Sequence, residues 1–312
     1  MPKISIIVPC CNEEESLPLF YREISRIAKE MEPVQFEFLF IDDGSKDHTL
    51  PLLREYAQSD SRVRFLSFSR NFGKEAGMLA GLETSTGEYA AFMDVDLQDP
   101  PDLLPELYRA VTVEGYDCAA TRRTTRKGEP PIRSLFARLF YKLINRISDA
   151  DIVDGARDYR LMNRRVMNAV LSMQEYNRFS KGIFGWVGFQ TKWVPFVNVE
   201  RAAGETKWSF WKLFLYSIEG IIAFSTAPLA AASVLGALLC GVSIFAILFI
   251  IAKTLLFGDP VGGWPSMMCV ILLIGGLQLL CMGILGQYLA KTYMESKRRP
   301  VYLVRETEKG LI

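Results

Sequence analysis

Phe36-Glu37-Phe38-Leu39-Phe40-Ile41-Asp42-Asp43-Gly44-Ser45 passes at once from a short, mostly apolar run into acidic and turn-forming residues, and this order indicates the fold class. The same order recurs along the first 120 residues, with helical spacing of apolar residues between the runs. This alternation predicts an α/β fold with a mostly parallel sheet covered on both faces. We expect strands at residues 3–10, 36–41, 63–67, 89–93 and 116–120, and helices at residues 16–31, 49–59, 74–84 and 101–114.

Polar residues follow four of the predicted strands, at residues 9–13, 42–45, 69–74 and 94–98. In open α/β sheets ligands bind beyond the carboxyl ends of the strands, so we expect the functional site there. The chain has no G-x-G-x-x-G after its first strand and no G-x-x-x-x-G-K-[ST] motif. A dinucleotide-binding fold and a P-loop nucleotidase are therefore disfavoured.

Acidic residues dominate these strand ends. Asp94 and Asp96, with Gln98, offer hard oxygen ligands of the kind that Mg²⁺ or Mn²⁺ uses beside substrate phosphates. Asp42 and Asp43 suit the hydroxyls of a ribose and the N–H of a base. An Asx turn at Asp-Gly-Ser is an equally good interpretation of that second pair.

The overall composition excludes several classes of protein. The 312 residues carry 36 basic and 35 acidic side chains, a net charge of +1, which does not favour nucleic acid as a partner. His48 is the single histidine, so a His-ligated zinc site and most Ser-His-Asp or Cys-His mechanisms are excluded. The six cysteines form no C-x-x-C pair, which argues against a disulfide framework and a zinc knuckle.

Two uncharged stretches, at residues 221–252 and 260–290, each exceed the roughly 20 apolar residues that cross a bilayer. We expect a transmembrane hairpin. Basic residues flank the hairpin on the side of the termini, so the positive-inside rule places the catalytic domain and both termini in the cytoplasm. Residues 134–147 have a basic amphipathic pattern suited to an anionic membrane face. A solvated surface helix is the alternative there.

Four motifs taken together resemble a known family: Pro9-Cys10-Cys11-Asn12-Glu13, Asp42-Asp43-Gly44-Ser45, Arg70-Asn71-Phe72-Gly73-Lys74 and Asp94-Val95-Asp96-Leu97-Gln98-Asp99-Pro100-Pro101. They resemble the inverting GT-A glycosyltransferases of the dolichol-phosphate-mannose-synthase type. The two-span C-terminus resembles the bacterial polyprenyl-phosphate (bactoprenol) glycosyltransferases. The resemblance implies a GT-A fold, Rossmann-like with a mostly parallel sheet, in a cytosolic domain followed by a two-helix transmembrane hairpin.

The resemblance also implies a role for individual residues. The nucleotide-binding positions are Pro9, Asn12, Glu13, Asp42, Asp43, Lys74 and Asp94. The ligands of Mg²⁺ or Mn²⁺ are Asp94, Asp96 and Gln98. The acceptor phosphate meets Arg122, Arg126, Arg133, Arg201 and Lys207. The catalytic residues are Asp158, Asp96 and Arg122, with Asp154 close enough to Asp158 to leave the choice between the two carboxylates open.

The implied activity is transfer of a hexose, with glucose preferred, from a UDP-sugar to undecaprenyl phosphate. Inversion at the anomeric carbon, a bacterial inner-membrane location and a role in modifying cell-surface glycans belong to the same expectation. Membrane lipids and a homo-oligomer, with a tetramer among the options, complete the expected partners. A phosphate monoester is largely ionised at neutral pH, since its second pKa is about 6, so a strong general base is not required.

Two alternatives remain open at this point. A processive polysaccharide synthase would need more membrane spans and a Gln-x-x-Arg-Trp motif, and neither is present. A non-enzymatic membrane hairpin scaffold would not need the carboxylates at the strand ends. We expect a glycosyltransferase domain at residues 1–206, an interfacial helix at 207–222, transmembrane helices at 223–257 and 265–291, and a cytosolic tail at 292–312.

Overall fold

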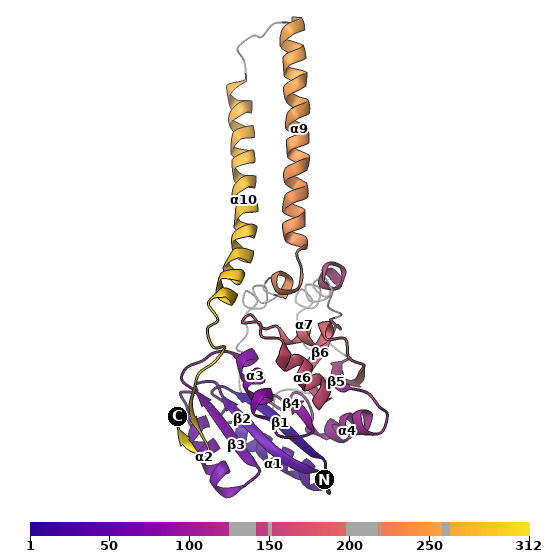
Figure 1. Cartoon of the computed structure of the whole chain (residues 1–312), viewed down its shortest axis with the longest axis vertical. Helices are drawn as coiled ribbons and strands as arrows, with labels where there is room; N and C mark the ends of the chain where they lie inside the picture. Colours follow the sequence, from indigo (N-terminus) through magenta and orange to yellow (C-terminus); the bar gives the residue numbers. More distant parts are fainter. Residues whose placement is uncertain (125–141, 149–151, 198–217, 219, 258–262) are drawn as a thin grey trace.

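The computed structural model describes residues 1–124, 142–148, 152–197, 218, 220–257 and 263–312. It comprises a sheet domain, with helices on both faces, and two long C-terminal helices that run side by side away from that domain (Figure 1). The α/β architecture with two apolar helices behind it confirms the predicted fold class.

The first half of the chain alternates strands and helices as predicted. Its strands are β1 (Lys3–Cys10), β2 (Gln35–Asp42), β3 (Val63–Phe68), β4 (Tyr89–Phe92) and β5 (Cys118–Arg123). Its helices are α1 (Leu17–Glu30), α2 (Thr49–Ser59), α3 (Lys74–Thr84), the short 3₁₀ helix η1 (Pro101–Leu103) and α4 (Leu104–Thr112). The fifth strand begins and ends later than the predicted 116–120.

The centre of the sheet is parallel because its strands are apolar on both faces. β1 pairs in parallel with β2 and with β4, and β2 pairs in parallel with β3. Neighbouring residues of β1 face opposite cores: Ile6 packs with the cluster that includes α1, α2 and α4, and Ile7 with the cluster that includes α3. Both faces must therefore be covered by helices, which crossover connections provide.

Several elements of the second half were not predicted. They are β6 (Ala156–Asn163), α6 (Arg164–Ser172), α7 (Ser180–Trp186), β7 (Thr191–Phe196), β8 (Val304–Thr307) and β9 (Gly310–Leu311). The full strand order is β7-β5-β6-β4-β1-β2-β3-β8-β9. β6 lies antiparallel between β4 and β5, and β8 lies antiparallel on β3, so the sheet is mixed around a parallel centre.

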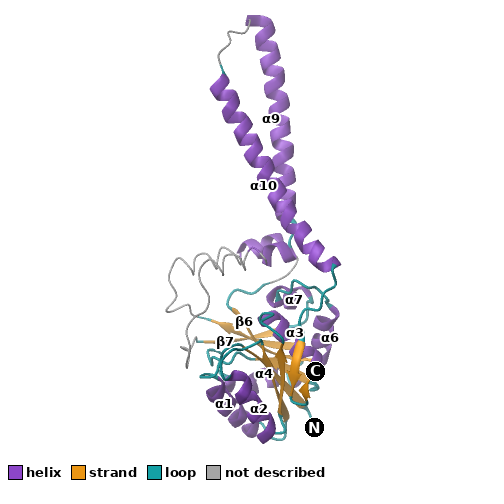
Figure 2. Ribbon diagram, turned by 90° about the vertical axis from the view of Figure 1, so that its left-hand side faces the viewer, coloured by secondary structure: helices purple, strands orange, loops and turns teal. Residues whose placement is uncertain are grey.

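The two apolar helices are α9 (Ala227–Phe257) and α10 (Trp264–Ser296). Both are long and apolar enough to cross a membrane, with mean hydropathies of 2.2 over Ala227–Ala246 and 1.6 over Leu273–Ser296. α7 lies between the sheet and this hairpin (Figure 2). Most of the predicted amphipathic helix at 134–147 and of the predicted interfacial helix at 207–222 lies outside the described residues.

Candidate active site

Hydrogen bonds join the loop after β1 to the loop after β2. Asn12 adopts a left-handed backbone conformation (φ 53°), and its backbone N–H donates to Ser45 Oγ at 2.9 Å. Its side-chain oxygen accepts from the backbone N–H of Lys46 at 2.8 Å. The N–H of Glu13 donates to Thr49 Oγ1 at 2.8 Å, at the start of α2. The first two strand ends therefore form one rigid edge, which also carries Pro9.

Asp42 is fully buried at the end of β2. Its Oδ1 accepts from the backbone N–H of Ser45 at 3.0 Å, and its Oδ2 accepts from Ser67 Oγ at 2.7 Å. The bond to Ser45 is the Asx-type contact that the Asp-Gly-Ser sequence suggested. A carboxylate oxygen has two lone pairs, but Asp42 has no exposed surface, so a ligand would reach the remaining ones only if neighbouring side chains moved.

Asp43 holds the loop that follows β3. Its two oxygens accept from the backbone N–H groups of Phe72 at 2.6 Å and Gly73 at 2.9 Å. Burial raises the pKa of Asp43 above its ordinary value, although these two N–H donors oppose the shift. The loop passes so close to Gly44 that a Cβ there would lie 2.6 Å from the carbonyl carbon of Arg70, so only glycine fits.

Lys74 lies at the centre of the site, at the first residue of α3. Its Nζ is 2.7 Å from Asp94 Oδ1, just beyond β4, and 2.6 Å from Asp158 Oδ2, on β6. Burial alone lowers the pKa of Lys74, but the carboxylates of Asp158 and Asp94 outweigh it and hold that pKa above its ordinary value. Burial alone raises the pKa of Asp158, but the ammonium groups of Lys74 and Lys181 outweigh it and hold that pKa well below its ordinary value.

Buried contacts that the sequence did not reveal support this cluster. Arg157 Nε donates to Asp99 Oδ1 at 2.8 Å and so ties the Asp94–Gln98 loop to β6. Burial raises the pKa of Asp99 to about 6, despite the opposing charge of Arg157. Glu75 accepts from the backbone N–H of Ser180 at 3.0 and 3.1 Å and from its hydroxyl, joining α3 to α7. Asp99 lies within the fourth motif and Glu75 directly follows the third, which was the available sequence signal.

The oxygen donors at the end of β4 suit a divalent cation. Asp94 and Asp96 alternate along the chain, and Asp96 Oδ1 accepts from the backbone N–H of Gln98 at 3.1 Å. The ammonium of Lys74 already pairs with Asp94 here, so a metal ion would have to share that carboxylate with Lys74. Among the described residues no group of three or more His, Cys, Asp and Glu side chains could hold a metal ion. Substrate phosphates and Gln98 would have to supply the remaining ligands.

The predicted acceptor residues are only partly described. Arg122, near the end of β5, donates from Nε to the backbone carbonyl of Asp154 at 3.0 Å. It is Asp158 whose carboxylate reaches Lys74, while Asp154 contacts Arg122 through its backbone. The remaining predicted positions, Arg126, Arg133, Arg201 and Lys207, lie outside the described residues.

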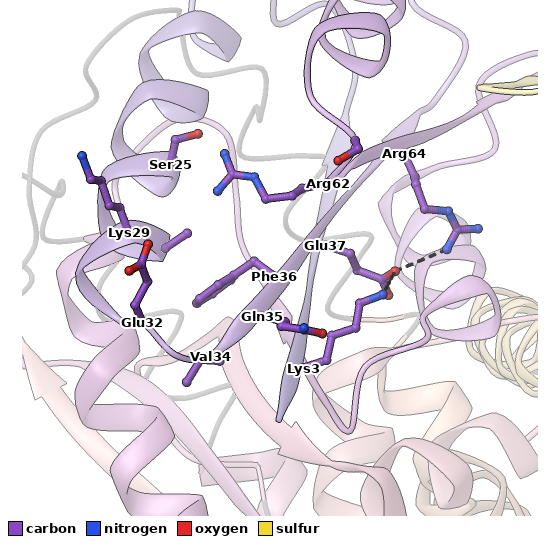
Figure 3. A pocket seen from close by; sticks show the side chains of 12 residues that line it. Lys3, Ser25, Lys29, Glu32, Val34, Gln35, Phe36, Glu37, Arg62 and Arg64 are labelled. Atoms are coloured by element: carbon purple, nitrogen blue, oxygen red, sulfur yellow. Dashed lines mark hydrogen bonds and ion pairs between the residues drawn. The ribbon is translucent and has the colours of Figure 1, made fainter. Parts of the chain in front are cut away.

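A cavity of about 600 Å³ opens on the opposite side from the strand ends described above, where the parallel strands begin (Figure 3). Its lining includes Lys3 and Arg64, which pair with Glu37 at 3.0 and 3.5 Å, and Arg62, which pairs with Asp60 at 2.7 Å. These cations are neutralised by carboxylates of the chain itself. Ligands of parallel sheets bind at the carboxyl ends of the strands, whereas this cavity lies at their amino ends.

The chain is similar in sequence to a known family and to several known proteins. The family model "Glycosyl transferase family 2" matches residues 5–171. A bactoprenol glucosyl transferase of Shigella phage SfX is 42% identical over 97% of this chain and 99% of its own length. A prophage bactoprenol glucosyl transferase homolog of Escherichia coli K12 is 41% identical over 98% and 100%, respectively. The crystal structure of glucosyl-3-phosphoglycerate synthase from Mycobacterium tuberculosis, with Mn²⁺, UDP-glucose and phosphoglyceric acid, covers 71% of this chain and 78% of its own at 19% identity and a TM-score of 0.48.

Proposed function

Since the chain belongs to glycosyl transferase family 2 and is a glycosyltransferase, we propose that it transfers glucose from UDP-glucose to bactoprenol phosphate, the undecaprenyl phosphate lipid, with inversion at the anomeric carbon. Two relatives named as bactoprenol glucosyl transferases or a homolog match nearly its whole length, which supports both sugar and lipid. The observation that carries the proposal is the contact of Lys74 with Asp94 and Asp158 at the strand ends.

The donor lies across the ends of β1, β2 and β4 in this proposal. Pro9, Asn12 and Glu13, with Asp42 and Asp43, hold the nucleoside, because these residues form the rigid edge described above. The ligands of the divalent cation are Asp94, Asp96 and Gln98. When bound there, Mg²⁺ or Mn²⁺ supplies positive charge against the diphosphate leaving group.

The contact of Asp158 with Lys74 favours an electrostatic role for this carboxylate over that of a general base. A carboxylate whose pKa lies well below the ordinary value is a poor proton acceptor, because the ideal catalytic pKa lies near the working pH. The acceptor phosphate is largely ionised at neutral pH and needs little help from a base. Asp158 therefore stabilises the positive charge that develops at the anomeric carbon, and Lys74 keeps its carboxylate oriented toward the site.

The acceptor approaches from the membrane in this proposal. The two apolar helices, with the domain and both termini on the cytoplasmic side, deliver the lipid phosphate to Arg122 and to Arg126, Arg133, Arg201 and Lys207. The division into a glycosyltransferase domain at 1–206, an interfacial helix at 207–222, spans at 223–257 and 265–291 and a tail at 292–312 belongs to the same proposal, as do the homo-oligomer and the role in cell-surface glycan modification.

The test is transfer of labelled glucose by the purified full-length protein in detergent. With Mn²⁺ or Mg²⁺ we expect label to pass from UDP-glucose to undecaprenyl phosphate, and the linkage of the product to be β when read by NMR. Asp96→Ala abolishes turnover if Asp96 holds the metal. Asp102→Ala is the matched control, since Asp102 is an exposed carboxylate of the same segment that pairs with Arg26.

The same assay decides against the alternatives. Failure to glycosylate the lipid from any UDP-sugar, with long polymer formed in the absence of lipid, would favour a processive synthase and sink the proposal. Full activity of Asp96→Ala would remove the metal assignment. A panel of UDP-glucose, UDP-galactose and UDP-N-acetylglucosamine identifies the sugar, and preference for another donor would overturn the choice of glucose.

A further inference from the structure

The chain returns from the second apolar helix to the sheet domain and adds a strand to it. After α10 ends at Ser296, β8 pairs antiparallel with β3, and the backbone N–H of Ser69 donates to the carbonyl of Leu303 at 2.9 Å. The ring of Tyr302 stacks on Phe68 with centroids 4.9 Å apart. The C-terminus consequently lies beside β3 and α2 (Figure 1). We name residues 301–312 the return segment.

An ion pair fixes the return segment to α2. Arg54 donates from Nε and Nη2 to the two carboxylate oxygens of Glu306, at 2.7 Å each. Such bidentate pairs define geometry as well as adding energy. The backbone of β8 is thereby held in one register along the edge of the sheet, and the neighbouring residue, Arg305, lies within hydrogen-bond distance of Ser67 near the carboxyl end of β3.

Arg305 reaches the candidate nucleoside site through one hydroxyl. Its Nη2 donates to Ser67 Oγ at 3.3 Å, and Ser67 Oγ donates to Asp42 Oδ2 at 2.7 Å. A serine hydroxyl has a single proton. With Arg305 donating to one lone pair of that oxygen, the hydroxyl proton is favoured to point at Asp42, whose carboxylate can only accept. Both Ser67 and Asp42 are fully buried, so a misdirected hydroxyl would leave a carboxylate oxygen without its donor.

We propose that Arg305 and Ser67 are positioning residues for the donor nucleotide, and that the return segment docks more firmly when the nucleotide is bound. This inference rests on the proposed placement of the nucleoside against Asp42. Arg305 lies beyond the second apolar helix in the sequence, so donor binding is linked to the path of the chain as it leaves the membrane hairpin.

The linkage is reciprocal by thermodynamic necessity. If an ordered return segment strengthens nucleotide binding, nucleotide binding must order the return segment by the same factor. We therefore expect UDP to slow hydrogen exchange of the β8 amides. Because UDP binding to the folded state protects every amide that exchanges through global unfolding, the specific expectation is slowing at β8 that is lost in Arg305→Gln while the other strands stay protected.

The experiment measures binding of UDP to the full-length protein in detergent by calorimetry, in the presence of Mn²⁺. Arg305→Gln and Ser67→Ala should each raise the Kd by about tenfold, because each removes a link in a hydrogen-bonded path to a charged group. Because both act through one path, the double variant should also be about tenfold weaker, not about a hundredfold. In steady-state assays the loss should fall on the KM for the donor, with kcat nearly unchanged.

Tyr302→Phe is the matched control. It removes the hydroxyl that contacts Glu83 but keeps the stacked ring and lies off the path to Asp42, so its Kd for UDP should equal that of the wild type. Ser67→Ala changes no residue of the return segment, so it tests the hydrogen-bonded path to Asp42 even where Arg305→Gln loosens the return segment.

Each outcome is decisive. Wild-type affinity in Ser67→Ala and Arg305→Gln, additive losses in the double variant, or β8 amides indifferent to UDP would overturn the positioning role alone. Absence of UDP binding by the wild-type protein would overturn the proposed donor, and the role of Arg305 with it.

Discussion

Gly81→Ala should weaken the packing of α3 on β1. A Cβ at Gly81 would lie 2.1 Å from Ile7 Cγ2, far inside the 3.4 Å at which ordinary contact begins, and Ile7 is fully buried in the central strand. Overpacking of this kind costs about 1–3 kcal/mol. Replacing a helical glycine by alanine returns about 1 kcal/mol of helix propensity. We therefore expect a net loss of up to about 2 kcal/mol of stability.

Gly77→Ala provides the matched control, one turn earlier in the same helix. Its Cβ would lie 3.2 Å from Pro9 Cβ and 3.7 Å from its next neighbours, so a small shift of the ring accommodates it. The propensity gain is the same, and this variant should be neutral or slightly stabilised.

Thermal unfolding of the two purified full-length variants in detergent, followed by tryptophan fluorescence, measures the difference. For a sheet domain of this size, about 2 kcal/mol between the variants corresponds to a Tm gap of about 5 °C. Gly81→Ala should also lose activity, because α3 carries Lys74 to its contacts with Asp94 and Asp158. A Gly81→Ala protein that melts at or above Gly77→Ala would refute the packing argument.

Three further changes test other parts of the structure. Burial alone raises the pKa of Glu37, but its hydrogen bonds lower that pKa from 4.5 to about 2. The wild type should therefore have about 3 kcal/mol of stability above pH 4.5 that it loses toward pH 2, and Glu37→Gln should lack this contribution. Equal curves of stability against pH for the two proteins would contradict this. Asp43→Asn keeps only one of the two side-chain oxygens that accept from the backbone N–H groups of the loop after β3. The KM for the donor should rise about tenfold while kcat is retained. An unchanged KM in steady-state assays would contradict this role of Asp43. Arg157→Leu leaves the buried carboxylate of Asp99 without its charged partner. The free energy of unfolding, measured with a chemical denaturant, should fall by about 3 kcal/mol, and a second change, Asp99→Asn, should restore part of it. No recovery in the double variant would exclude a charge effect.

The central elements of the fold were accessible from the sequence because the determining interactions are local. β1 and β2 are mostly apolar, interrupted only by Ser5 and Glu37 between their ends, and such a pattern requires cover on both faces and so favours a parallel arrangement. β6 was missed since two arginines and an aspartate interrupt its apolar pattern, and its place between β4 and β5 depends on pairing with strands distant in sequence. β8 is short and lies beyond the apolar helices, where its polar residues resemble a solvated tail.

Local patterns indicate which residue types gather at the strand ends, because strand direction and the position of each polar run can be read from them. They indicated Asp42, Asp94 and the remaining motif residues, and the resemblance of these motifs to a known family indicated the class of enzyme. The contacts of Lys74 with Asp94 and Asp158, and of Arg305 with Ser67, became visible only in the folded chain. They join residues up to 238 positions apart, and the packing of the sheet fixes which distant side chains meet.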